Sequence, residues 1–290
     1  MTPLDPFGDG IWLKREDEHQ LGAFKWRGAV AVLEARQPSV VVTASTGNHG
    51  AATAWAARRA GIRAIVFVPE QASAAKVALI EAQGGELRRA GADMDEAKAA
   101  AHAHAQQIGA FFFEDGAEPA QFDGYAAIGA ELLDQLAEPP GSVVVPVGNG
   151  ALAIGIFRAL AARAPATERA AVSAAAAPAM WESWRAGRPT DSERSATFAD
   201  GLAVRVAIPL AVAELNPLVQ RFDVVSEREL ALAVGAYAEA GIRVEGAAAA
   251  PLALALRENL RPPIVLIVTG RNIDDELWRR AVEAPSSFAA

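Results

Sequence analysis

The feature that most constrains the fold is an alternation along the chain of short apolar runs and Ala-rich stretches with a helical pattern. The runs are rich in β-branched residues, as in Val143 to Val145, and buried strands of parallel sheets have this composition. An order of strand, helix, strand is typical of helices that cover a mostly parallel sheet. The sequence therefore predicts an α/β fold.

The middle of the chain predicts a compact unit of four strands, from about Val41 to Phe122. We expect its strands at Val40 to Thr43, Ala64 to Val68, Glu86 to Arg89 and Phe111 to Phe113, and helices over Asn48 to Ala60, Ser73 to Gln83 and Met94 to Ile108. This gives a small domain over residues 41–122. Residues 1–40 and 123–290 are expected to form a larger domain.

Composition excludes several classes of function. A net charge of -8 over 290 residues gives no basic surface for nucleic acid or for an anionic membrane. The absence of cysteine excludes disulfides, thiolate metal sites and a cysteine nucleophile. The start of the chain does not resemble a signal peptide, and no apolar run is long enough to span a bilayer. We therefore expect a cytoplasmic protein without an appended regulatory domain.

Lys25 is the most informative single residue. It stands between Phe24 and Trp26, at the expected start of an amphipathic helix. Such a lysine can be partly desolvated, and its amine then becomes a nucleophile able to form a Schiff base. Taken alone, Lys25 is more simply explained as an exposed lysine at a helix start.

Two strand ends carry groups that suit a phosphorylated ligand. After the apolar run Val143 to Val145, the chain continues as Gly148-Asn149-Gly150-Ala151, and Leu152 begins a helical pattern. A Gly-rich turn at a helix N-terminus presents unpaired N–H groups that can bind phosphate. After a second buried strand comes Thr269, which places a hydroxyl at the edge where open α/β sheets bind ligands.

Seven ordered segments resemble the motifs of the fold-type II pyridoxal-phosphate enzymes. The most similar branch is threonine/serine dehydratase, an ammonia-lyase, with serine racemase beside it. The segments are TPLDPF, KREDEHQLGAFKWRGA, VVTASTGNHGAATAWAARRAG, VVVPVGNGALAIG, TFADGLAV, EGAAAAPLALAL and IVTGRNID. The resemblance implies two open, mostly parallel twisted sheets covered by helices, as in the tryptophan synthase beta-like fold. It also implies pyridoxal 5'-phosphate, a small amino-acid substrate and a homodimer.

The resemblance implies a role for each matching residue. Lys25, after Phe24, binds the cofactor aldehyde, and Asn48 bonds its phenolic oxygen. Thr269 meets the pyridine nitrogen. The substrate carboxylate is received by Ser45, Thr46, Gly47, Asn48 and His49, and the phosphate by Gly148, Asn149, Gly150, Ala151 and Leu152. Because a neutral hydroxyl does not favour a protonated pyridine, the ring is a weaker electron sink, which suits β-elimination better than transamination.

The chain departs from the family pattern at several positions. Asn149 and Ala151 replace two of four glycines in the phosphate turn, and Arg271 replaces a glycine after Thr269. Ala196 stands where metal-dependent relatives have a glutamate, so no metal is predicted. Glu245 corresponds to a residue near the pyridine ring, but it also suits the N-terminus of an Ala-rich helix.

Three other functions stay open at this point. Racemisation needs a second proton carrier, and Thr46 stands where serine racemases have a serine, although its branched side chain is less free to turn. The segment from Ala44 to Gly61 also has features of threonine synthase and of β-replacement enzymes. A catalytically silent protein that binds pyridoxal phosphate is the third. Dehydration of L-threonine or L-serine to a 2-oxo acid and ammonia is the main prediction.

Overall fold

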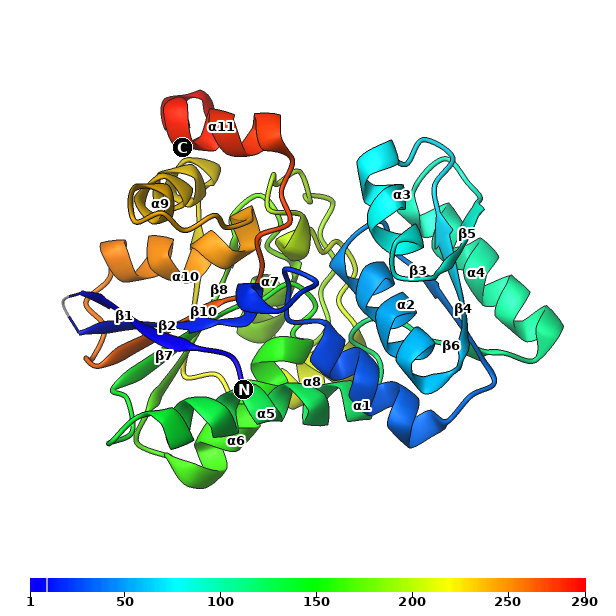
Figure 1. The fold of residues 1–290 in the computed structure, drawn as a ribbon. Coiled ribbons are helices and arrows are strands. Elements are labelled where there is room, and N and C mark those ends of the chain that lie inside the picture. The colour runs from blue at the N-terminus through cyan, green and yellow to red at the C-terminus, as the bar shows by residue number, and fades with distance from the viewer. Residues whose placement is uncertain (9) are drawn as a thin grey trace. The chain divides into compact units, whose positions relative to one another are not determined.

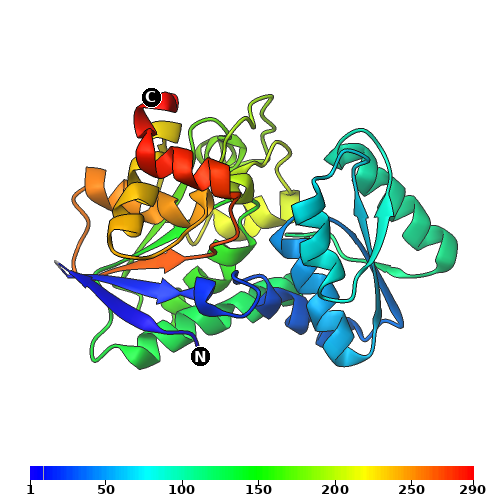
Figure 2. The same cartoon turned by 45° about the horizontal axis from the view of Figure 1, so that its top comes forward.

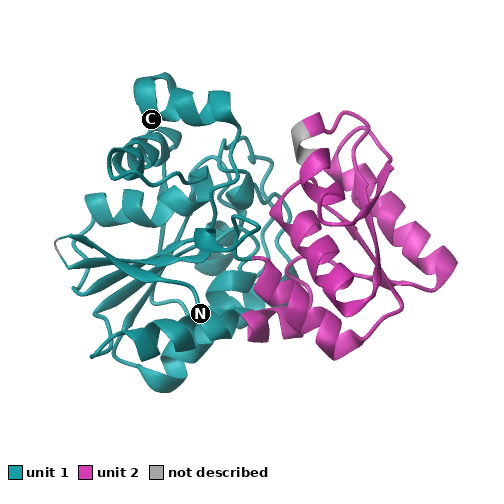
Figure 3. Ribbon diagram, in the orientation of Figure 1, with its two compact units in different colours: residues 1–24, 125–290 teal, residues 25–124 magenta. Residues whose placement is uncertain are grey.

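A computed structural model of the chain describes residues 1–8 and 10–290, without the side chains of residues 75 and 76. The chain divides into two compact units, residues 1–24 with 125–290 and residues 25–124, which we call unit 1 and unit 2 (Figure 3). Within the described residues, no helix is both long and apolar enough to cross a membrane.

Unit 1 contains a six-stranded sheet with the strand order β1-β2-β10-β7-β8-β9. Only β1 runs antiparallel to its neighbour, and the other four pairings are parallel. The strands are β1 (Leu4–Gly8), β2 (Ile11–Arg15), β7 (Ser142–Pro146), β8 (Glu168–Ala174), β9 (Arg221–Val225) and β10 (Ile264–Val268). Every residue of β7 and β10 is buried, as their apolar sequences predict.

Helices cover both faces of this sheet (Figures 1 and 2). On one face α10 packs against β7 to β10 with α9 and α11 beyond it, and α6 packs on β7 and β8. The helical elements are η1 (Glu16–Glu18), α6 (Ala151–Arg163), α7 (Ala179–Ala186), η2 (Asp200–Leu202), α8 (Pro209–Leu215), α9 (Glu227–Glu239), α10 (Gly246–Arg257), α11 (Asp275–Glu283) and η3 (Pro285–Ser287). The helix α5 (Pro119–Gln135) begins in unit 2 and ends in unit 1.

Unit 2 contains a parallel four-stranded sheet with the order β5-β4-β3-β6. Its strands are β3 (Val40–Ala44), β4 (Arg63–Val68), β5 (Glu86–Arg89) and β6 (Phe111–Phe112), and its helices are α1 (Trp26–Arg36), α2 (Asn48–Ala60), α3 (Ala74–Glu81) and α4 (Met94–Ile108). Figure 1 shows α2 and α3 on one side of the sheet and α4 on the other. The helix α1 packs on α2.

The predicted α/β fold with two mostly parallel sheets is confirmed, and so are the four strands of the smaller unit. The unit boundaries differ from the predicted limits of 40/41 and 122/123. Residues 25–40 belong with unit 2 because α1 packs on α2, a contact that apolar patterning along one segment does not reveal. Lys25 is therefore part of the smaller unit and not of the larger one.

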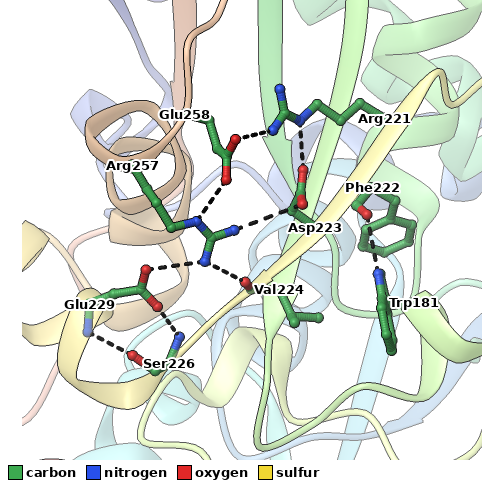
Figure 4. Close-up of polar contacts among 9 residues, drawn as sticks. All are labelled: Trp181, Arg221, Phe222, Asp223, Val224, Ser226, Glu229, Arg257 and Glu258. Carbon is green, nitrogen blue, oxygen red and sulfur yellow. Dashed lines mark hydrogen bonds and ion pairs between the residues drawn. The ribbon is translucent and has the colours of Figure 1, made fainter. Parts of the chain in front are cut away.

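An ion-pair network joins β9 to α9 and α10 in unit 1 (Figure 4). Arg221 contacts Asp223 at 2.6 Å and Glu258 at 2.5 Å, and Arg257 contacts Glu229 at 3.1 Å. Glu229 also closes a capping box with Ser226, which fixes the first turn of α9. These side chains are about one third exposed, so solvent screens their attraction, and the network mainly orients the helix ends.

Candidate functional site

Lys25 is the N-cap residue of α1, as the sequence predicted. The segment before it lies along the end of β10 in unit 1. Ala23 forms an antiparallel bridge with Gly270, and the amide of Phe24 donates to the carbonyl oxygen of Thr269 at 3.1 Å. The residue preceding the lysine is thus fixed by hydrogen bonding to the strand end that carries the Thr269 hydroxyl.

The Lys25 amine forms an ion pair with the carboxylate of Asp115, in unit 2. The Lys25 side chain is 17% exposed and that of Asp115 is 25% exposed, so both are largely withdrawn from water. Burial by itself raises the pKa of the Asp115 carboxyl, but the charges of Lys25 and His49 and hydrogen bonds from Lys25 and Gln121 lower it well below its ordinary value. The predicted partial desolvation of Lys25 is therefore combined with a close negative charge.

His49 is buried in the first turn of α2. The Thr43 hydroxyl donates to the carbonyl of Phe113 at 2.8 Å, so its oxygen accepts from Nε2 of His49 at 3.0 Å. The other ring nitrogen, Nδ1, lies 3.7 Å from Asp115 Oδ1. The imidazole thus contacts Thr43 and faces Asp115 within unit 2, and its assignment to the substrate carboxylate stays a prediction.

The segment Ser45 to His49, which we call the loop, joins β3 to α2 and includes the first two residues of α2, whose N-cap residue is Gly47. The amide of Gly47 donates to Ser45 Oγ at 3.1 Å, and this bond closes the turn. A Cβ at Gly50 would lie 2.9 Å from the Ser45 carbonyl oxygen, so only glycine fits beneath the loop. The amides of the first turn of a helix have no intrahelical partner and suit a carboxylate.

The predicted phosphate turn lies between β7 and α6, and its N-cap residue Gly150 has a φ of +95°. The left-handed position is therefore taken by a glycine, and not by Asn149. Asn149 instead accepts a hydrogen bond through Oδ1 from the amide of Ala151 at 3.1 Å. Leu152 is buried in the first turn of α6. One of the amides expected to bind phosphate is thus engaged by a side chain of the same turn.

Thr269 Oγ1 is buried and has no hydrogen-bond partner among the described residues. A hydroxyl in this condition points to a missing polar partner, which a ligand nitrogen can supply. Glu245, the N-cap residue of α10, donates its amide to the carbonyl of the neighbouring Gly270 at 3.0 Å. A Cβ at Gly270 would lie 2.8 Å from Glu245 Oε1, so this glycine makes room for the carboxylate.

Arg271, Asp274 and Gly148 each make a local contact in unit 1. Arg271 lies 4.0 Å from the Glu18 carboxylate, so its charge is paired at the surface of unit 1. Asp274 caps α11 by accepting from the amides of Glu276 and Leu277, as expected for an acidic helix start. Gly148 packs closely against Gly201. A Cβ at position 148 would lie 2.2 Å from the Gly201 carbonyl oxygen, so only glycine fits there.

Asp115 and Gln121 were not identified from the sequence. Asp115 follows β6 in the sequence Phe113-Glu114-Asp115-Gly116, and a carboxylate just after a parallel strand is a recognised place for ligand groups. That signal was present, but β6 is only two residues long. Nothing in the sequence says that this strand end meets Lys25.

These residues fit an aldehyde cofactor that has a phosphate and a ring nitrogen. Unit 2 carries the Lys25 amine and the loop at the N-terminus of α2. Unit 1 carries the turn at the N-terminus of α6 and the Thr269 hydroxyl without a partner among the described residues. Such a molecule requires an amine for its aldehyde, a helix N-terminus for its phosphate and a buried hydroxyl for its ring nitrogen.

Comparisons with known proteins agree with this set of donors. The sequence profile described as pyridoxal-phosphate dependent enzyme matches residues 2–270. An L-threonine ammonia-lyase from Geobacter sulfurreducens is 34% identical over 278 residues, which cover 93% of this chain and 69% of that enzyme.

Two solved structures have a similar fold. The processed form of threonine deaminase isoform 2 from Solanum lycopersicum matches with a TM-score of 0.92 and 27% identity, over 97% of this chain and 87% of that one. Maize serine racemase matches with a TM-score of 0.85 and 27% identity, over 96% and 88% of the two chains.

Proposed function

Because the chain belongs to the family of pyridoxal-phosphate dependent enzymes, we propose that it is a lyase that dehydrates L-threonine or L-serine to a 2-oxo acid and ammonia. The observation that carries this proposal is the 34% identity to an L-threonine ammonia-lyase along 93% of the chain. The Thr269 hydroxyl, which has no hydrogen-bond partner among the described residues, supports it, because a neutral partner for the ring nitrogen favours rapid β-elimination.

When bound, pyridoxal phosphate supplies the aldehyde that takes the substrate amine and the ring that withdraws electrons from it. Lys25 would hold the cofactor between turnovers, and its amine would accept the α-proton of the substrate as a general base. The loop Ser45 to His49 binds the α-carboxylate, and the turn Gly148 to Ala151 with Leu152 binds the phosphate. Loss of the β-hydroxyl gives an enamine, and its hydrolysis yields the 2-oxo acid and ammonia.

Asn48 and Glu245 complete the proposed set of residues. Asn48 is the first residue of α2 and is assigned to the phenolic oxygen of the cofactor. Glu245 is assigned to the surroundings of the ring, and its carboxylate beside Gly270, the residue after Thr269, supports this assignment.

Racemisation of serine is the second candidate, and the likeness to maize serine racemase favours it. Inversion requires a proton donor on the substrate face opposite to Lys25. The Thr46 hydroxyl is assigned this role, and Thr46 lies half-buried in the turn between β3 and α2. Its branched side chain restricts rotation about χ1, so we expect inversion to be slower than elimination.

The decisive experiment incubates the purified holoenzyme with the L- and D-forms of threonine and serine. Formation of 2-oxo acid, ammonia and the opposite enantiomer is measured in the same samples. Equal amounts of 2-oxo acid and ammonia from the L-forms support the lyase. Inversion without ammonia selects the racemase, and a bound cofactor without any product selects a silent binding protein.

Two further properties are part of the proposal. We expect a homodimer in the cytoplasm, as the resemblance to the dehydratases implies. Light scattering on the purified protein tests the dimer, because the mass of one chain is 30.3 kDa and a dimer has twice that value.

A further inference from the structure

The ion pair between Lys25 and Asp115 is not required by any role assigned so far. The two side chains come from different elements of unit 2, and 90 positions separate them in the sequence. Asp115 lies between β6 and α5, whereas Lys25 caps α1. Both side chains are largely buried, so their attraction is screened by solvent far less than that of a surface pair.

Gln121 fixes the orientation of the Asp115 carboxylate. The Gln121 side chain is fully buried, and its amide nitrogen donates to Asp115 Oδ1 at 2.7 Å. Its carbonyl oxygen accepts from the amide of Gly116 at 2.8 Å, so both ends of the side chain are bound. With Oδ1 occupied in this way, Oδ2 is directed to the Lys25 amine.

The charged and titratable groups around the pair come from α1, α2 and the segment after β6. They are the Lys25 amine, the His49 imidazole and the Asp115 carboxylate. His49 is hydrogen-bonded to Thr43, and the Lys25 amine is the cation in direct contact with Asp115 Oδ2. An amine held in this contact must leave the carboxylate before it can react with an aldehyde.

We propose that Asp115 is a positioning residue for Lys25. Oriented by Gln121, its carboxylate holds the Lys25 amine in one place in protein that has not yet bound the cofactor. This inference rests on the proposed function only in that Lys25 is the lysine that takes the cofactor. It assigns to Asp115 the place that the amine takes before the cofactor binds.

The test measures the reactivity of the free amine in protein without cofactor. The chain has four lysines, Lys14, Lys25, Lys76 and Lys98, so peptide mass spectrometry can follow each one separately. Trace acetic anhydride at pH 7.5 acetylates only neutral amines. In Asp115→Asn we expect Lys25 to be acetylated about tenfold faster than in the wild type, because the charge-assisted hydrogen bond that must break before the amine can react is absent.

The matched control is Glu114→Gln, which removes the partner of Lys98 from the neighbouring position in the chain. The Lys98 side chain is 49% exposed, so solvent already screens this pair. We expect less than about a twofold change at Lys98 and none at Lys25. An unchanged Lys25 rate in folded Asp115→Asn, or an equal rise in Glu114→Gln, would overturn the proposal.

A second measurement uses wild-type protein, so it tests the contact between Lys25 and Asp115 even if Asp115→Asn does not fold. Wild-type protein labelled with 15N-lysine and free of cofactor is examined by NMR at neutral pH. We expect a slowly exchanging ammonium signal that disappears in Lys25→Arg, and its absence would refute the ion pair. Neither measurement uses a substrate, so the ion pair and the proposed lyase activity can fail independently.

Discussion

Phe24 donates its backbone amide to the carbonyl oxygen of Thr269, and the two residues come from opposite ends of the sequence. This bond, with the bridge between Ala23 and Gly270, fixes the segment before Lys25 along the end of β10. Within unit 1, the residue before Lys25 is therefore hydrogen-bonded to the strand end that carries the Thr269 hydroxyl. The chemistry proposed for Lys25 and Thr269 leads to the following predictions.

Lys25→Ala should abolish both covalent cofactor attachment and formation of 2-oxo acid, because no amine remains to take the aldehyde. Attachment is measured by borohydride reduction and mass spectrometry, and turnover by 2-oxo acid release. Lys98→Ala is the control, since Lys98 is half exposed and pairs with Glu114 at the surface. Cofactor linkage or turnover retained in folded Lys25→Ala would show that the assignment is wrong.

Thr269→Val should stabilise the protein without cofactor and weaken cofactor binding. The hydroxyl is buried without a partner among the described residues, and its removal should relieve about 1 kcal/mol of desolvation cost. The lost bond to the ring nitrogen should lower affinity about tenfold. Thermal unfolding without cofactor and titration with pyridoxal phosphate measure the two effects.

Thr53→Val is the matched control for this pair of measurements. Thr53 Oγ1 in α2 is also buried without a partner in the described part of the chain. We expect the same gain in stability with unchanged cofactor affinity. If Thr269→Val behaves like Thr53→Val in both measurements, the Thr269 hydroxyl does not meet the cofactor.

Asn149→Ala should free the Ala151 amide, which now donates to the Asn149 side chain. Loss of this bond should destabilise the protein without cofactor by about 1 kcal/mol, as loss of a helix cap does. The freed amide can then bind phosphate, so we expect tighter binding of pyridoxal phosphate in a fluorescence titration. Weaker binding would mean instead that the Asn149 side chain itself contacts the phosphate.

The stability of the fold should fall below pH 6.5 because of His49. Burial lowers the pKa of the His49 imidazole below its ordinary value of 6.5, and the Lys25 charge adds to this effect while Asp115 opposes it. As the pH falls, the unfolded chain takes up a proton that the folded protein does not. The free energy of unfolding should therefore decrease by up to about 1.4 kcal/mol per pH unit below 6.5.

Urea unfolding of the protein without cofactor at pH 7.5, 6.5 and 5.5 measures this dependence. In His49→Gln the slope below pH 6.5 should be smaller, because the titrating group is gone. His102→Gln removes an exposed imidazole and should leave the slope as in the wild type. Equal slopes in the wild type and in His49→Gln would contradict the prediction.

Local sequence predicted the secondary structure closely in unit 2. The bounds of α2, β5 and α4 coincide with those expected, because helix starts, glycine stops and apolar runs act within one segment. The placement of Lys25 at a helix start and of the Gly-rich turn between a strand and a helix follows from the same local signals. The roles given to these residues came from the ordered motifs and are still proposals.

The sequence by itself determined the α/β class, the order of the elements and the segments that carry the amine, the turn and the hydroxyl. Only the tertiary structure decided that residues 25–40 join unit 2, that His49 turns to Thr43, and that Asp115 meets Lys25. The physical reason is that helix and strand signals depend on neighbours along the chain. Pairs between distant segments depend instead on how the strands are ordered in the sheet, which no local pattern specifies.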